Sequence, residues 1–156
     1  MIARTKLKEI AEEIGIQSDE HTSYFDRETG EVLMVSDNEM RVAEENISLE
    51  DYPEWQHEMI AMAKLVVNDA EGRYLPIPSK WDFHEYKVME KFCWSRDDEE
   101  QSENLLDAIQ GRGAFRMFKD RIHRLGIQND WYRFRDEALE VLASDWAEEN
   151  GIELTD

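Results

Sequence analysis

The stretch that decides the fold class is Tyr24-Phe25-Asp26-Arg27-Glu28-Thr29-Gly30-Glu31-Val32-Leu33-Met34-Val35. Two apolar or aromatic segments flank a polar loop, which ends in Gly30. Glycine tolerates the left-handed backbone conformation that tight turns require, so the pattern predicts a β-hairpin. The apolar residues from Val32 to Val35 are consecutive. We therefore expect either that both faces of the second strand are covered or that the second face meets helices.

Helical periodicity begins on both sides of this hairpin. Leu7, Ile10, Ala11 and Ile14 recur at i, i+3, i+4 and i+7, and Gly15 follows as a stop, which predicts a short amphipathic helix. A brief helix is expected over residues 37–45.

Proline marks the boundaries of the next segment. Pro53 predicts the start of a longer helix that ends before Gly72, because proline at the first helical position costs no hydrogen bond. The residues expected to form its buried stripe are Trp55, Met59, Met62, Ala63 and Val66. Residues 74–78 contain two prolines and are expected to be an edge strand or a packed linker.

From Asp82 the pattern is helical almost to the C-terminus. Asp82 and Glu85 have capping-box spacing, residues 97–100 place four carboxylates in a first helical turn, and Asn129 or Asp130 is expected to cap the last helix. The stripe expected to be buried after the Gly111-Arg112-Gly113 break is Ala114, Phe115, Phe118, Ile122 and Leu125.

Together these elements predict an α+β fold that is mainly α-helical, with an N-terminal helix and β-hairpin packed against a C-terminal helical array. We expect a single domain over residues 1–156, which can be divided into two sub-lobes. These are residues 1–50, the helix plus hairpin, and residues 51–156, the helical part.

The composition excludes several classes of protein. The 156 residues include 18 Lys and Arg against 37 Asp and Glu, a formal net charge of −19. Charge of this sign opposes nucleic-acid or anionic-membrane binding by the whole surface. No apolar run is long enough to cross a membrane. Aromatic residues make up 10% of the chain, enough for a buried core despite the acidity.

The single cysteine and the first residues bear on the compartment. Cys93 cannot form an internal disulfide, and its position between Phe92 and Trp94 favours a small buried hydrophobe over a reactive nucleophile. Residues 1–8 become charged at once and lack the apolar core of a secretory signal. These observations predict a cytoplasmic protein.

Positive charge is concentrated in residues 111–135, which we call the basic segment. It holds seven Lys and Arg against two Asp, a charge of +5, while the remaining 11 basic and 35 acidic residues give −24. The candidate site residues for an anion or a partner are Arg112, Gly113, Arg116, Lys119, Arg121, Arg124, Tyr132, Arg133 and Arg135.

Three interpretations of the basic segment stay open. It can pair internally with residues 97–100, Glu103 and residues 136–140 on neighbouring helices. It can form an anion or phosphate pocket, because Gly111 and Gly113 leave backbone N–H groups approachable at a helix N-terminus. It can also be a docking surface for an acidic partner.

Aromatic residues are interleaved with these cations. Rings beside guanidinium groups suit stacking on single-stranded bases, although rings at helical spacing also form cores. Tyr132 is the best candidate for an exposed ring, since it lies off the stripe of Trp131 and Phe134.

Metal and catalytic patterns are weak. His21, His57, His84 and His123 have no mutual i, i+4 spacing, and no nucleophile elbow or Ser/His/Asp set is present. Residues 97–100 lack the loop geometry of a hard-cation site and are expected to be a solvated helix start. The sequence indicates no cofactor and no metal.

Three stretches carry a family resemblance. Residues 109–120 with 131–135, the turn from Asp26 to Gly30 and the segment 74–78 resemble the signatures of the bacterial Uncharacterised Protein Family 0158. The resemblance implies a small cytoplasmic protein without an assigned activity, and it brings no catalytic residues.

We therefore expect a non-enzymatic binding or regulatory module whose basic helical surface engages an anionic partner. RNA fits the basic segment but is disfavoured by the overall charge. One alternative is an enzyme acting on a phosphorylated small molecule, with phosphate at residues 111–113 and a carboxylate from residues 97–100. Another is a structural or oligomeric interaction protein that uses exposed Met and Trp residues.

Overall fold

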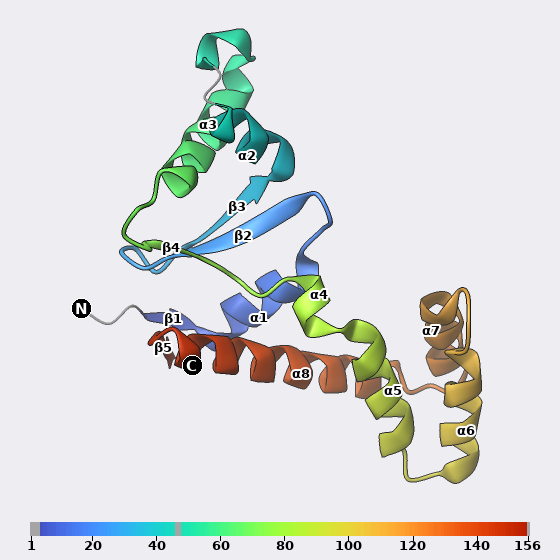
Figure 1. Cartoon of the computed structure of the whole chain (residues 1–156). Coiled ribbons are helices and arrows are strands. Elements are labelled where there is room, and N and C mark those ends of the chain that lie inside the picture. Colours follow the sequence, from blue (N-terminus) through green and yellow to red (C-terminus); the bar gives the residue numbers. More distant parts are fainter. Residues whose placement is uncertain (1–3, 46–47, 156) are drawn as a thin grey trace.

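The computed structural model describes residues 4–45 and 48–155, and Figure 1 shows its arrangement around one long C-terminal helix. The helices are α1 (Leu7–Ile16), α2 (Asp37–Glu44), α3 (Glu54–Val67), α4 (Lys80–Phe83), α5 (Glu85–Ser95), α6 (Glu99–Ala108), α7 (Ala114–Arg124) and α8 (Gln128–Glu149). The strands are β1 (Arg4–Lys6), β2 (His21–Asp26), β3 (Val32–Ser36), β4 (Tyr74–Pro76) and β5 (Glu153–Thr155), and a 3₁₀ turn covers Leu49–Asp51. The mainly helical α+β fold is confirmed. Residues 1–3, the start of the stretch compared with a secretory signal, lie outside the described residues.

The predicted hairpin is β2 and β3, which pair antiparallel with Phe25 opposite Val32. The Gly30 amide donates to the Asp26 carbonyl at 2.8 Å, and Gly30 has the positive φ, 76°, that the turn requires. Strand β4 pairs with the other edge of β2, with Leu75 opposite Phe25. The segment with two prolines is thus an edge strand, as predicted.

Both faces of this three-stranded sheet are covered. On one face Val35 packs with Ala43 of α2 and Ala63 of α3. On the other, Phe25 is fully buried and meets Trp146 of α8 edge to face, with 5.8 Å between ring centroids. The consecutive apolar run of β3 follows from this layering, because α2 and α3 lie on one side and α1 and α8 on the other.

Helix α1 packs along α8, and the two helices approach closely at a small residue, Gly15. Gly15 lies inside α1 rather than after it, so the predicted stop was wrong. A Cβ built at Gly15 would stand 3.1 Å from Leu139 Cδ1, so glycine serves the close approach of the two helices. Strands β1 and β5 pair in parallel beside this contact, with Thr5 opposite Leu154. No pattern in the sequence predicted the pairing of β1 with β5.

Helices α5, α6 and α7 form an array at the end of α8 that lies away from the sheet (Figure 1). Its core is a cluster of edge-to-face rings: Phe118 lies 4.9 Å from Trp131, and Phe92 contacts both. Cys93 is fully buried beside them, as predicted. The array is therefore held to α8 by aromatic packing.

Several helices begin or are capped at other residues than the sequence predicted. The capping box is formed by Ser79 and Asp82 rather than by Asp82 and Glu85. His84, with a φ of 52°, separates α4 from α5. Helix α8 begins at Gln128 after Ile127 with no side-chain cap, so Asn129 and Asp130 lie within it. Asp98 is the N-cap of α6. Of the four acids at residues 97–100, only Glu99 and Glu100 therefore lie in the first helical turn.

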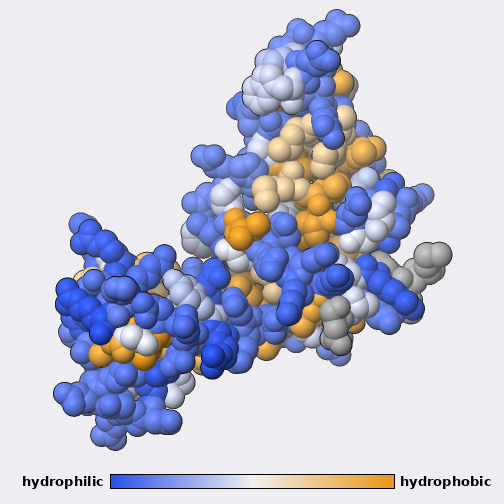
Figure 2. All heavy atoms as spheres, turned by 180° about the vertical axis from the view of Figure 1, so that it is seen from behind, coloured by the Kyte–Doolittle hydropathy of each residue, from blue (hydrophilic) through white to orange (hydrophobic). Residues whose placement is uncertain are grey.

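The buried stripe of α3 is also shifted from the prediction. Ile60 and Ala63 are buried, whereas Trp55 is 77% exposed. The Met59, Met62 and Val66 side chains of the predicted stripe are half-buried. Figure 2 shows apolar side chains gathered on the rear face of this part of the molecule.

Candidate functional site

The candidate site is built on α7 and on the turn that leads into it. Gly111 and Gly113 both have positive φ, and Gly113 is the N-cap residue, whose carbonyl accepts from the Met117 amide at 2.9 Å. Ala114, Phe118 and Ile122 are buried, at i, i+4 and i+8. This spacing turns the opposite face of α7 to the solvent.

Three of the seven predicted cations lie on this solvent face or in the turn before it. Arg116, Lys119 and His123 follow at i, i+3 and i+7, and Arg112 lies in the turn at the N-terminal end of the helix. We call Arg112, Arg116 and Lys119 the cationic face. All three are exposed, and none forms an ion pair with a residue in the described ranges.

Two other predicted residues of α7 are engaged locally. Arg124 pairs with Asp120 one turn earlier at 3.2 Å, and both side chains are more than half exposed. Arg121 lies against α6, where its guanidinium donates to the carbonyl and the side-chain oxygen of Asn104. An exposed ion pair such as that of Arg124 with Asp120 contributes at most about 1 kcal/mol to the free energy of unfolding.

Arg135 is a structural residue rather than part of the cationic face. Its guanidinium donates to Glu85 at 2.7 Å and to the Gly15 carbonyl at 3.3 Å, and it lies over the Phe83 ring. It thereby joins α8 to α1, α4 and α5. Arg133 is exposed and lines a shallow hollow of about 310 Å³ between α5 and α8.

The expected internal pairing takes a different form from the one predicted. None of the ion pairs between described residues joins the basic segment to residues 97–100, Glu103 or residues 136–140. The carboxylate of Asp130 accepts instead from Arg96, at 3.1 Å. Arg96 also donates to Gln101 and lies over the Phe92 ring. Sequence reasoning missed this residue, because a lone arginine before an acidic run carries no pattern.

The glycine turn is open surface. Within 4 Å of a Cβ built at Gly111 or Gly113 there is no other atom. Arg112 and His123 line none of the four hollows of about 310 to 380 Å³ that lie beside α1, α2 and α5. The backbone N–H groups at the start of α7 can meet an anion, but they do so without enclosing it.

The interleaved aromatic residues divide between core and surface. Phe118 and Trp131 are buried in the ring cluster, whereas Phe115 is 45% exposed and Tyr132 is 54% exposed. The predicted exposure of Tyr132 is confirmed. The predicted burial of Phe115 and Leu125 was wrong, because each lies at a border of the buried face of α7.

Comparison with known proteins identifies the family. The model of UPF0158, described as an uncharacterised protein family, matches residues 2–155. The chain belongs to UPF0158. A relative from Pseudomonas aeruginosa, the UPF0158 protein PA5073, is 31% identical over 67 residues. This match covers 42% of the present chain and 44% of the relative, so it spans less than half of that protein. No solved structure matches the chain.

The stretches that carried the UPF0158 resemblance lie in different elements. Residues 26–30 form the turn of the hairpin, and residues 109–120 cover the turn before α7 and the first part of that helix. Residues 131–135 lie within α8, and residues 74–76 form β4. In the described residues of this UPF0158 chain, no helix is both long and apolar enough to cross a bilayer.

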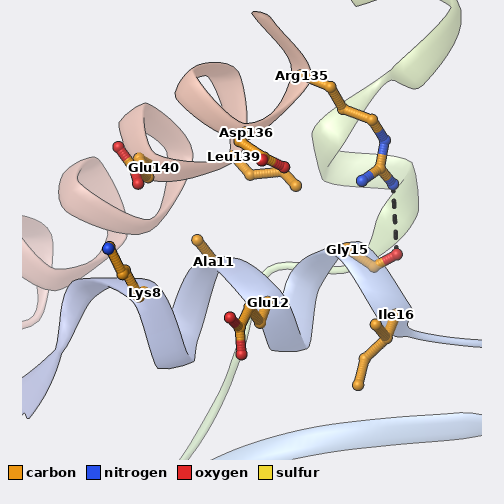
Figure 3. A pocket seen from close by; sticks show the side chains of 9 residues that line it. All are labelled: Lys8, Ala11, Glu12, Gly15, Ile16, Arg135, Asp136, Leu139 and Glu140. Carbon is orange, nitrogen blue, oxygen red and sulfur yellow. Dashed lines mark hydrogen bonds between the residues drawn. The ribbon is translucent and has the colours of Figure 1, made fainter. Parts of the chain in front are cut away.

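A second surface feature of this UPF0158 chain is a groove of about 380 Å³ between α1 and α8 (Figure 3). Ala11, Gly15 and Leu139 form its apolar floor. Lys8, Glu12, Ile16, Arg135, Asp136 and Glu140 complete the lining. Figure 3 shows the Arg135 guanidinium turned toward the Gly15 carbonyl, so this cation is already engaged. The remaining lining charges are three carboxylates and one ammonium, which makes the groove acidic.

The other two hollows are acidic as well. One of about 350 Å³ lies between α1 and the hairpin, with Glu9, Glu12, Glu13 and Glu31 in its wall. The other, also about 350 Å³, lies at the start of α2 beside Glu20, His21 and Asp37. Anions are therefore repelled from these hollows, in contrast to the cationic face.

Three of the four histidines form structural contacts through their rings, and the cysteine is buried. The ring nitrogens of His21, His57 and His123 contact Ser18, the Tyr52 carbonyl and Gln128 respectively. Burial raises the pKa of the Cys93 thiol to about 11, so it stays protonated and unreactive near neutral pH. Within the parts of the chain that the structure describes, no group of three or more His, Cys, Asp or Glu side chains is arranged to hold a metal ion.

Proposed function

We propose that this UPF0158 chain is a non-enzymatic binding or regulatory module that engages an anionic partner through the cationic face. The observation that carries the proposal is the state of Arg112, Arg116 and Lys119. All three are exposed and unpaired within the described residues of a chain with a net charge of −19.

An acidic chain offers many carboxylates to any cation that is left free. The seven ion pairs of the described residues engage Arg4, Arg73, Lys80, Arg96, Arg124 and Arg135, but not the cationic face. Three cations at one end of a helix attract an anion together, and the positive end of the α7 dipole adds to this attraction. The location that fits the proposal is the cytoplasm, where a buried free thiol such as Cys93 is ordinary.

The test is charge reversal at the N-terminal end of the face. Heparin-agarose serves as an immobilised polyanion, and the measurement is the NaCl concentration that elutes the protein. We expect Arg112→Glu combined with Arg116→Glu to remove retention, because two attractive charges become repulsive. The matched control combines Lys6→Glu with Arg27→Glu, which changes the net charge equally at exposed positions in the β1 and hairpin regions.

Two outcomes would count against the proposal. Equal elution of wild type, test variant and control would show that the cationic face does not bind anions. A thermal midpoint many degrees lower in the test variant would show that the two arginines stabilise the fold. Because neither arginine forms an ion pair with a described residue, we expect the midpoint to stay within a few degrees of wild type.

A second candidate, an oligomeric interaction protein, is favoured by α3. Trp55 and Leu65 of this helix are exposed, at 77% and 56%. Large apolar side chains on one exposed helix favour contact with a second copy of the chain. Light scattering at two protein concentrations tests this candidate, since a monomer at both would exclude it. The enzyme alternative gains no support, because none of the four hollows contains Arg112 or His123.

A further inference from the structure

We infer that the anionic partner of the cationic face is an acidic amphipathic segment of a protein rather than a nucleic acid. This inference rests on the proposed function and names its partner class. Three properties of α7 and its surroundings support it: the apolar ring beside the cations, the short extent of the face, and the acids around it.

An apolar side chain borders the cations of α7. Phe115 is 45% exposed and lies four residues before Lys119, so the two side chains are neighbours on the helix surface. Met117 is 39% exposed but lies on the other side of α7. Figure 2 shows apolar side chains surrounded by hydrophilic ones on the array of α5, α6 and α7. Phenylalanine and arginine are enriched in protein interfaces, and a phosphate backbone would leave the Phe115 ring without an apolar contact.

The length of the cationic row on α7 matches the spacing of side chains on a partner helix. Arg116 and His123 are seven residues apart, so this row of α7 is roughly 10 Å long. Carboxylates that recur every three or four residues along a partner helix have the same spacing. A nucleic-acid site that relies on phosphate contacts ordinarily uses more cations, about 6 to 10.

The acids around the cationic face oppose a long polyanion. Helix α6 packs beside α7 and exposes Glu99, Glu100, Glu103 and Asp107. Asp120 lies on α7 itself, paired with Arg124. A nucleic-acid strand extending beyond the row would meet these carboxylates, whereas a helical segment can place its own acids on the cations and its apolar residues on Phe115.

The experiment compares three fluorescein-labelled probes by anisotropy with the full chain. The first is an acidic peptide of about 20 residues with leucine on one face and glutamate beside it. The second has the same composition in an order that separates the leucines. The third is a single-stranded RNA of about 20 nucleotides. We expect the amphipathic peptide to bind about tenfold more tightly than the other two probes.

Two sets of variants divide the charge contribution from the apolar one. Arg116→Glu with Lys119→Glu should weaken binding of the amphipathic peptide about tenfold or more, while Lys6→Glu with Arg27→Glu should not. Phe115→Ser should weaken binding of the amphipathic peptide several-fold and leave binding of the scrambled peptide unchanged. Leu65→Ser, at an exposed apolar position of α3, is the control.

The outcomes separate this inference from the proposed function. Tighter binding of RNA, or equal binding of the two peptides, would overturn the inference and leave the cationic face as an anion-binding surface. If neither the peptides nor RNA respond to Arg116→Glu with Lys119→Glu, both the inference and the proposed function fail. Phe115 is 45% exposed, so we expect Phe115→Ser to leave the fold intact and its effect on binding to be measurable.

Discussion

At the scale of single residues, the ion pair of Asp26 and Arg73 fixes the hairpin to β4. The Arg73 guanidinium donates to both carboxylate oxygens, at 2.8 and 2.9 Å, and the Asp26 side chain is almost fully buried. The hydrogen bonds from Arg73 are the largest cause holding the pKa of Asp26 below its ordinary value of 3.8. Burial acts in the opposite direction, and the Glu28 amide adds a further hydrogen bond that lowers the pKa.

This geometry gives a prediction for acid stability. Because the pKa of Asp26 is lower in the folded chain than in the unfolded chain, its stabilisation is complete above pH 3.8 and is lost as the pH falls through the folded value. Asp26→Asn should reduce the free energy of unfolding by about 2 kcal/mol at neutral pH, less than for a fully buried pair because Arg73 is one-third exposed.

Urea unfolding of both proteins at pH 7 and at pH 3 measures this effect. The difference between them should shrink at pH 3. Glu28→Gln is the matched control, since the Glu28 carboxylate pairs with the same arginine at 3.1 Å but is 67% exposed. A difference that is as large at pH 3 as at pH 7 would contradict the assignment.

Gly30 provides a second prediction at this scale. A Cβ at Gly30 would stand 2.7 Å from the Arg4 carbonyl oxygen, whereas a Cβ at Gly72 would meet no atom within 4 Å, and both residues have a φ of 76°. Gly72→Ala therefore measures the backbone cost alone, about 1 kcal/mol. We expect Gly30→Ala to lower the free energy of unfolding by more than Gly72→Ala does. Equal losses in urea unfolding would show that β1 moves away from the turn without cost.

At the scale of elements, α3 shows which face of a helix the rest of the molecule covers. Ile60 and Ala63 are buried, and Ala63 packs with Val35 of the sheet, so the buried side of α3 lies about a quarter-turn from the predicted stripe. Ile60→Ala should lower the free energy of unfolding by about 2–4 kcal/mol. Trp55→Ala should change it by less than about 0.5 kcal/mol in a monomer, as at other exposed positions. If Trp55→Ala instead lowers the free energy of unfolding strongly, and by an amount that depends on protein concentration, α3 is buried between two copies of the chain.

The hairpin and α3 also show how far the sequence predicts the elements. The hairpin was predictable because its strands, its loop and Gly30 lie within sixteen residues, where the local pattern determines the pairing. The face of α3 was not, because α3 has apolar residues on two adjacent sides and the sheet selects one of them. The pairing of β1 with β5 joins residues nearly 150 positions apart over three residues each, and such short strands carry no local pattern.

The candidate site, like the fold, was predictable from the sequence only in part. The basic segment was visible as a charge difference, and helical spacing placed Arg116 and Lys119 together on α7. Spacing could not distinguish Arg116, which is exposed, from Arg135, which bonds to Glu85 and Gly15. The partners of Arg135 come from residues 50 and 120 positions away, so its role required the packing of α8 against α1 and α5.

At the scale of the whole molecule, the net charge of −19 is spread over a surface of 10369 Å². Few of the 37 acidic residues form ion pairs among the described residues, and the groove and both hollows beside α1 and α2 are lined by carboxylates. Repulsion between them is stronger in the folded chain than in the unfolded chain, because folding brings them closer.

Salt should therefore stabilise the fold. Raising NaCl from about 10 to 150 mM shortens the screening length from roughly 30 to 8 Å, which is the scale of the spacing between surface charges. We expect the thermal midpoint to rise over this range, and choline chloride at equal ionic strength to raise it equally, since screening does not depend on the cation. A fall in the midpoint would mean that attractive pairs such as Asp26 with Arg73 and Glu85 with Arg135 outweigh the repulsion. The same addition of salt should weaken anion binding at the cationic face, so stability and binding should change in opposite directions.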